Sequence, residues 1–203
     1  MGCDDLFKKA QAAKKKKRVK LEKPKILIVC EGEKTEPYYF EQFRPANVSV
    51  QGLGFNTLSL VQAAIKIRDD DATGFDQVWC VFDKDSFPMT NVSRAFSLAK
   101  KEDIHIAYSN EAFELWYILH FDFLQSAISR NDYIQRLNTL MQEKFNRTYR
   151  KNDRDMYRLL LPYQSVAIGN ARKLAGCYQK RNLGNNPLTD VDSLVDELNK
   201  WRD

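Results

Sequence analysis

The chain of 203 residues lacks several features that would assign it to familiar protein classes. Its four cysteines (Cys3, Cys30, Cys80 and Cys177) form no CxxC pair, and with only two histidines beside them a zinc site has little support. No apolar run approaches the length needed to cross a bilayer, and the charged N-terminus lacks the apolar core of a secretory signal. We therefore expect a cytoplasmic protein with no membrane partner.

Positive charge is scarce in most of the chain, although the formal net charge is +5. Residues 1–25 hold ten Lys or Arg against three acids, which leaves residues 26–203 with a formal charge of −2. We interpret residues 1–24 as a basic, flexible tail that either holds nucleic-acid phosphates non-specifically or only aids solubility. Residues 25–203 are long and apolar enough to form one domain with its own core.

The first half of this domain alternates between strand and helix patterns. Apolar runs predict strands at 25–30, 48–51, 77–82 and 104–108. Helices are predicted from Thr35, whose hydroxyl would cap the first one, over residues 57–70, and from an Asn91 cap to residue 100. This alternation predicts an α/β fold with a parallel sheet flanked by helices.

From residue 110 onwards the pattern is helical. The stretch 113–121 is apolar nearly all round, as in a buried helix. Further helices are predicted at 131–145, 153–161, 164–180 and 190–200. We therefore divide the domain into an α/β core at 25–110 and a helical C-terminal elaboration at 111–203.

Carboxylates follow two of the predicted core strands. Glu31, Glu33 and Glu36 come after the first strand, and Asp83 and Asp85 come after the third. Ligands of open parallel sheets sit at the carboxyl ends of the strands, and grouped carboxylates there suit Mg²⁺ or Mn²⁺. We take Glu31, Asp83 and Asp85 as the metal ligands if their strands are neighbours. Glu33 and Glu36 are secondary candidates, since Glu36 would also favour a helix N-terminus electrostatically.

Three residues of the next segment are further candidates. Glu114 lies in the apolar stretch, where an unpaired charge is costly, so it needs a metal, a cation or a buried partner. Glu111, three residues earlier, would share its helical face. His120 is more simply a core histidine, with a catalytic role as the alternative.

Phosphate-binding cations must come from a few local positions because the body of the chain is acidic. Lys34 and Lys84 lie within the two acidic segments. A basic stretch interleaved with tyrosines adds Arg147, Arg150, Lys151 and Arg154. The alternative for each of these residues is an ordinary solvated helix face.

These motifs resemble known families. Glu-Gly-x-x-x-Glu after the first strand, with Asp-x-Asp after a later one, is similar to the Toprim arrangement of topoisomerases and bacterial primases. Several segments in order resemble the RloB family, a set of small bacterial proteins with a Toprim-like core: residues 28–40, 81–85, 109–116, 167–171 and 186–189.

The resemblance implies a Toprim-like (Rossmann-like) fold and a Mg²⁺-dependent endonuclease acting on RNA, by analogy tRNA, or on DNA. It further implies a role in anti-phage defence by abortive infection, beside an ATPase subunit encoded alongside. Glu31, Asp83, Asp85 and Glu114 would then be catalytic, with Glu31 as a metal ligand or as the general base. The alternative is a non-catalytic nucleic-acid-binding or regulatory subunit of such an ATPase complex. Homo-oligomerisation is left open.

Overall fold

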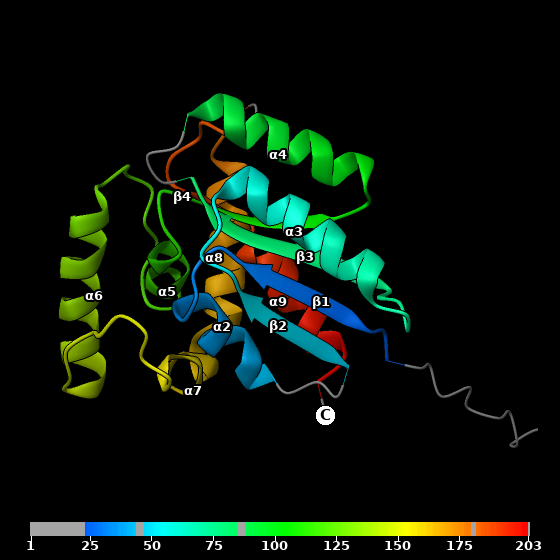
Figure 1. Cartoon of the computed structure of the whole chain (residues 1–203). Coiled ribbons are helices and arrows are strands. Elements are labelled where there is room, and N and C mark those ends of the chain that lie inside the picture. Colours follow the sequence, from blue (N-terminus) through cyan, green and yellow to red (C-terminus); the bar gives the residue numbers. More distant parts are fainter. Residues whose placement is uncertain (1–22, 44–46, 85–87, 180–181, 203) are drawn as a thin grey trace, which may run out of the picture.

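A five-stranded sheet forms the centre of the molecule, with the strand order β2-β1-β3-β4-β5 (Figure 1). The computed structural model describes residues 23–43, 47–84, 88–179 and 182–202. The strands are β1 (Ile26–Cys30), β2 (Val48–Gly52), β3 (Gln77–Asp83), β4 (His105–Asn110) and β5 (Leu188–Thr189). The first four run parallel, and β5 runs antiparallel to β4. The predicted α/β class is confirmed, but the sequence pattern does not predict β5, because two residues are too few to show a period.

Strand β1 lies between β2 and β3, and all five of its residues are buried. An apolar run without alternation is typical of a strand that is covered on both faces. The register pairs Cys30 at the end of β1 with Gly52 on one side and Val81 on the other. The carboxyl ends of β1, β2 and β3 therefore meet at one edge of the sheet.

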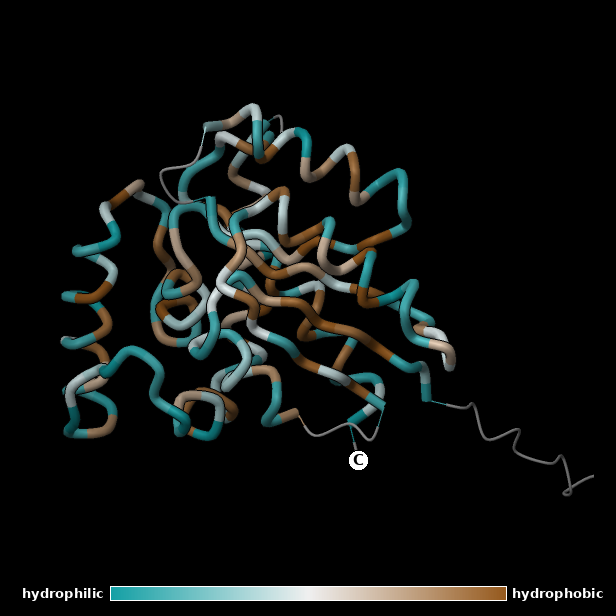
Figure 2. The backbone as a smooth tube through the Cα atoms, viewed as in Figure 1, coloured by the Kyte–Doolittle hydropathy of each residue, from teal (hydrophilic) through white to brown (hydrophobic). Residues whose placement is uncertain are grey.

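The two faces of the sheet belong to separate hydrophobic cores, because successive side chains of a strand point to opposite faces. Leu27, Val29 and Cys80 pack into the smaller core under α3 (Thr57–Asp70) and α4 (Met89–Lys101). Both helices lie on the same side of the sheet in Figure 1. Figure 2 shows a continuous apolar stretch of backbone along β1, whose sequence is ILIVC.

The opposite face is covered mainly by helices from the second half of the chain. They are α5 (Glu114–Leu119), α6 (Arg130–Phe145), α7 (Met156–Leu160), α8 (Gln164–Gly176) and α9 (Val191–Lys200). Helix α2 (Thr35–Phe40) and the short 3-10 turns η1 (Glu41–Phe43) and η2 (Leu161–Tyr163) complete the elements. Every residue of α5 is buried, as its apolar sequence predicts.

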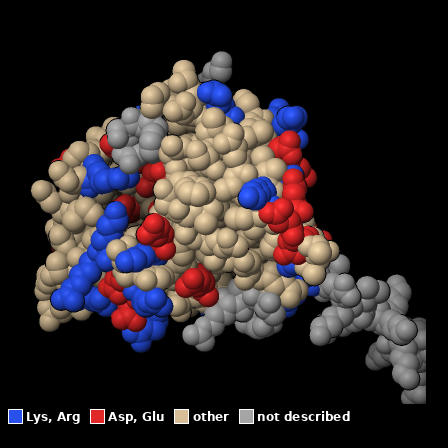
Figure 3. All heavy atoms as spheres, in the orientation of Figure 1, with Lys and Arg blue, Asp and Glu red and all other residues tan. Residues whose placement is uncertain are grey.

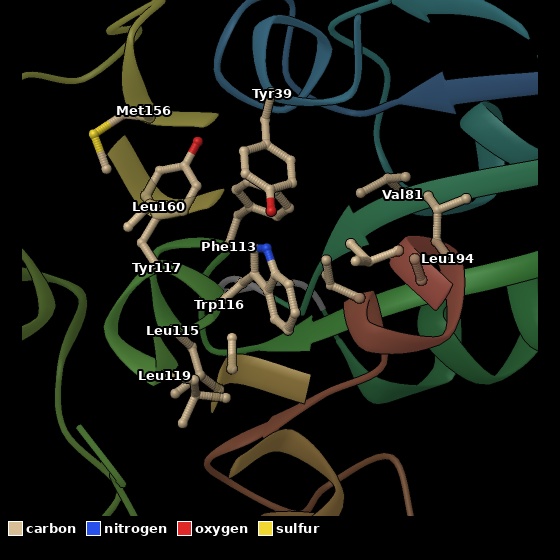
Figure 4. Close-up of a cluster of buried hydrophobic side chains, with 14 of the residues drawn as sticks. Tyr39, Val81, Phe113, Leu115, Trp116, Tyr117, Leu119, Met156, Leu160 and Leu194 are labelled. Carbon is tan, nitrogen blue, oxygen red and sulfur yellow. The ribbon is translucent and has the colours of Figure 1, made fainter. Parts of the chain in front are cut away.

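Aromatic side chains link α2 to α5 within this larger core (Figure 4). The ring of Tyr39 lies 5.9 Å from that of Phe113 and 5.7 Å from that of Tyr117. Tyr39 is thus a packing residue. Helix α5, whose first residue is Glu114, is thereby held against the helix that follows β1.

Two predicted helix caps are wrong. Lys34, not Thr35, precedes the first turn of α2, and the Thr35 hydroxyl instead donates to Asn152 Oδ1 at 2.7 Å. Helix α4 begins at Met89 after Pro88, so Asn91 lies inside it. Pro88 has an extended ψ of 136°, which places the boundary before Asn91.

Three predictions concern the tail, the end of one helix and membrane-spanning segments. The predicted basic tail falls almost entirely on residues 1–22, which lie outside the described residues. Helix α8 ends at Gly176, four residues before the predicted end. Over the described ranges, no helix has both the length and the apolar character needed to cross a bilayer.

Candidate functional site

A cavity of about 400 Å³ opens at the edge of the sheet where β1 and β3 end. It lies on the side of the larger core, between the loop after β1, the start of α5, the start of α6 and the loop between α6 and α7. The lining residues are Glu31, Gly32, Glu33, Lys34, Thr35, Glu36, Gly54, Asp83, Phe113, Glu114, Arg130, Lys151 and Asn152.

Glu31 and Asp83 lie close together because β1 and β3 are neighbours, which is the condition that the sequence prediction set. The backbone amide of Glu31 donates to the carbonyl of Val81 at 2.9 Å and so extends the ladder between β1 and β3. The backbone amide of Asp83 donates to Glu31 Oε2 at 3.3 Å. The two acidic strand ends therefore form one site.

Asp83 is a strongly perturbed acid of the cavity. Burial raises the pKa of its carboxyl well above the usual range, and the nearby charges of Glu36 and Glu114 raise this pKa further. Arg130 opposes this effect, since its Nη2 lies 3.3 Å from Asp83 Oδ2. The Asp83 side chain is 15% exposed, so the ion pair is only partly screened by water.

Glu36 is buried beneath the loop that follows β1, with 7% of its surface exposed. Its Oε2 has no hydrogen-bond partner among the described residues. Burial raises the pKa of Glu36, a hydrogen bond from its own backbone lowers it, and Glu114 raises it again. A Cβ at Gly32 would lie 2.0 Å from Glu36 Oε2, so a larger residue there would displace the Glu36 carboxylate. Glu36 therefore faces the site and does not serve merely as a solvated acid at a helix start.

Glu114 begins α5 and is 6% exposed. The sequence predicts that Glu114 needs a partner, and the structure supplies Tyr149, whose hydroxyl donates to Glu114 Oε1 at 3.2 Å. Burial and the Glu114 charge raise the pKa of Tyr149, so this hydroxyl keeps its proton. Glu33 also lines the cavity, but it is exposed.

The loop between α6 and α7 brings a lysine to the cavity. Lys151 lines it, and the next residue, Asn152, accepts the hydrogen bond from Thr35. Asn152 has a φ of +64°, a left-handed conformation that asparagine tolerates better than most residues. The Arg154 guanidinium lies 4.0 Å from the ring centre of Tyr38 on α2. These two contacts fasten the loop to α2.

The other predicted cations are distributed differently. Lys34 lines the cavity, Arg150 is exposed, and Arg147 forms ion pairs with Asp153 and Asp155. Lys and Arg side chains gather along the side of α6 and α7, with acidic groups beside them (Figure 3). This surface borders the cavity and suits an extended anionic ligand.

Several predicted residues lie away from the cavity or outside the description. Glu111 precedes α5 in a bend, so the prediction that it shares a helical face with Glu114 is wrong. His120 is a core residue: its Nδ1 lies 2.8 Å from the Trp116 carbonyl, and burial lowers its pKa to about 4. Lys84 does not line the cavity, and Asp85 lies outside the described residues.

Sequence reasoning missed Arg130, which stands 47 positions after its partner Asp83. A usable signal exists at the start of α6, where Ser129 and Asp132 form a capping box and Arg130 is the first helical residue. A cation is unfavourable at the positive end of a helix dipole, so an arginine there indicates an anionic partner elsewhere.

The donor chemistry of the cavity fits a divalent cation of the Mg²⁺ type. Its lining carries five carboxylates and three cationic side chains, a formal charge of −2, and it includes the unpartnered oxygen of Glu36. Within the described residues, however, no three acidic, histidine or cysteine side chains are gathered closely enough to hold a metal ion as they stand. A bound cation would therefore need these acids to move closer together or a further ligand, such as the predicted Asp85.

The comparisons with known proteins give one finding. The chain matches the family described as RloB-like protein over residues 26–198. No curated protein matches it, and neither does any solved structure. Because the match covers most of the chain and includes all the residues that line the cavity, the protein belongs to the RloB-like family.

Proposed function

We propose that the protein is a Toprim-type, Mg²⁺- or Mn²⁺-dependent nuclease that cleaves phosphodiester bonds in RNA, tRNA included, or in DNA. We further propose that it works in the cytoplasm with a partner ATPase in anti-phage defence. The observation that carries the proposal is the buried, unpartnered Glu36 oxygen inside a cavity whose acids follow β1 and β3. Acids after two neighbouring parallel strands also support the Toprim interpretation of the fold.

The acids divide into those that would hold the cation and those that support them. Glu31 and Asp83 would hold it together with Asp85, and the burial of Glu36 makes this secondary candidate a further possible ligand. A bound divalent cation would polarise the scissile phosphate and make its bound water more acidic. The alternative role for Glu31 is that of general base, because its carboxylate faces the cavity beside Asp83. Tyr149 holds Glu114 in place through its hydroxyl.

Cations at the rim would position the nucleic acid. Lys34 and Lys151 line the cavity and can pair with the phosphate at the cleavage position. The exposed Arg150 and Arg154 stand in the same loop as Lys151 and can contact neighbouring phosphates. This arrangement brings a polyanion to a cavity that is itself acidic.

Metal binding is tested by thermal melting with and without Mn²⁺. The melting temperature of the wild type should rise with Mn²⁺, and that of Asp83→Ala should not. The exposed Asp70→Ala on α3 is the matched control and should shift as the wild type does. Equal shifts in wild type and Asp83→Ala would exclude this metal site.

Activity is tested by co-expressing the protein with its neighbouring ATPase and sequencing the ends of the nucleic acids recovered. Cleavage should disappear in Glu31→Gln, while the exposed Glu143→Gln on α6 should cleave normally. Unchanged cleavage by Glu31→Gln would contradict the role given to Glu31.

A second candidate is a nucleic-acid-binding subunit without catalysis. It is favoured by the ion pair between Arg130 and Asp83, which neutralises one predicted metal ligand, and by the absence of a ready three-ligand group among the described residues. This candidate predicts nucleic-acid binding that is unaffected by Mn²⁺ and no cleavage with the ATPase present.

A further inference from the structure

We propose that Arg130 is an exchangeable counter-ion. It occupies Asp83 in the metal-free protein, and it moves to a phosphate of the nucleic acid when a divalent cation binds Asp83. This inference rests on the proposed function and deepens it, because it assigns a substrate-binding residue and couples metal binding to substrate binding.

The first step of the argument is the position of Arg130. Its backbone is fixed at the start of α6, since the hydroxyl of Ser129 and the carboxylate of Asp132 cap the helix reciprocally. Its side chain reaches from there to Asp83 Oδ2 at 3.3 Å. With 39% of the side chain exposed and the cavity beside it, the guanidinium has room to move while the backbone stays in place.

The second step is competition for one carboxylate. The guanidinium of Arg130 and a divalent cation both need the oxygens of Asp83, and two positive groups at this distance repel each other. The lining has a formal charge of −2, so a divalent cation neutralises it and reduces the attraction that holds Arg130 there. The position of Arg130 at the start of α6, which is unfavourable for a cation, then favours a new contact between its guanidinium and an anionic ligand.

The third step is the chemistry of the new partner. A guanidinium can donate two parallel hydrogen bonds to a phosphate, which makes arginine better suited to this ligand than lysine. The cavity that Arg130 lines is the place where a phosphate would meet Lys34 and Lys151. The same residue therefore neutralises an acid before metal binding and a phosphate after it.

The experiment compares Arg130→Ala, Arg130→Lys and Arg136→Ala with the wild type. Arg136 is the matched control, because it lies on the same helix, is 43% exposed and pairs with Asp122, away from the cavity. Two dissociation constants are measured by calorimetry: that of Mn²⁺ without nucleic acid, and that of a labelled single-stranded RNA in Ca²⁺. Melting without metal shows that each variant is folded.

Opposite changes in the two constants are expected from Arg130→Ala. Without the competing guanidinium, Mn²⁺ should bind about fivefold more tightly, the size expected for a partly exposed ion pair. RNA should bind about tenfold more weakly, because a charge-assisted contact is lost. The Arg130→Lys variant should have a dissociation constant for Mn²⁺ close to that of the wild type and one for RNA between those of the wild type and Arg130→Ala. Arg136→Ala should change neither constant.

Each alternative outcome is distinguishable. If Arg130 only supports the fold, Arg130→Ala melts lower but binds Mn²⁺ no more tightly, which overturns the proposal. Tighter Mn²⁺ binding with unchanged RNA binding also overturns it, because Arg130 would then be a counter-ion alone. If the wild type binds no Mn²⁺, the proposed function itself has failed, and the role of Arg130 fails with it.

Discussion

Glu36 gives the sharpest test of the electrostatics of the cavity. We expect Glu36→Gln to stabilise the metal-free protein near neutral pH. The carboxylate is 7% exposed, and its Oε2 lacks a hydrogen-bond partner among the described residues, so its charge is poorly compensated. The charge of Glu36 also raises the pKa of Asp83, so the substitution removes a buried charge and the repulsion that this charge exerts on Asp83.

The size of the effect follows from the cost of a buried carboxylate oxygen without a hydrogen-bond partner. That cost is about 1–3 kcal/mol, and a gain of this size in a domain of this length raises the melting temperature by about 2–4 °C per kcal/mol. Since the pKa of Glu36 is raised on folding, the wild type should lose stability as the pH rises above the ordinary value of glutamate, about 4.3. The difference between variant and wild type should therefore vanish below that pH.

The assay is urea denaturation of both proteins over a pH series, with EDTA present. Glu33→Gln is the control, because Glu33 lies in the same loop and lines the same cavity but is exposed. It should remain within about 0.5 kcal/mol of the wild type. Added Mn²⁺ should reduce or reverse the difference in free energy of unfolding between Glu36→Gln and the wild type, because metal binding stabilises the wild type more than the variant.

One result would refute this reasoning. If Glu36→Gln is no more stable than the wild type near neutral pH and follows the same pH dependence, the Glu36 carboxylate is already compensated. The proposal that the cavity binds a divalent cation would then lose its main support.

Two further substitutions test how the cavity is supported. Tyr149→Phe removes the donor to Glu114 and should cost about 1–3 kcal/mol in the free energy of unfolding, measured by urea denaturation; an unchanged value would show that Glu114 has another partner. Thr35→Val removes the bond to Asn152 and should cost about 1 kcal/mol and speed hydrogen exchange in residues 147–153, whereas Thr35→Ser should retain both; equal exchange in the two variants would contradict the anchoring of this loop.

The sheet and its acidic edge could be predicted from sequence because both depend on local patterns. The apolar run of β1 is continuous because the strand is buried on both faces, and its end coincides with Glu31. The pairing of β1 with β3 then brings Asp83 opposite Glu31. Residue type and strand length predicted the acids at the two strand ends, whereas the pairing of β1 with β3, which the prediction left as a condition, is a finding of the structure.

The rest of the site depends on contacts between distant segments, which no local pattern records. Glu36 follows a glycine loop and reads as a solvated acid until α5 and the loop at Lys151 enclose it. The sequence predicts that Thr35 caps a helix, but its hydroxyl donates to Oδ1 of Asn152, which lies 117 positions later in the chain. Arg130 acquires its role only when the start of α6 is placed beside β3.

The two cores of the sheet also set the order in which the protein can be completed during synthesis. The core under α3 and α4 needs little beyond residue 110, so it can close while the second half of the chain is still being translated. The opposite core draws on residues as late as Leu198, and the cavity lies on that side. A chain that ends before Asn152, the last residue in sequence to line the cavity, therefore lacks part of the site, and one that ends before Leu198 lacks part of the core on the same side.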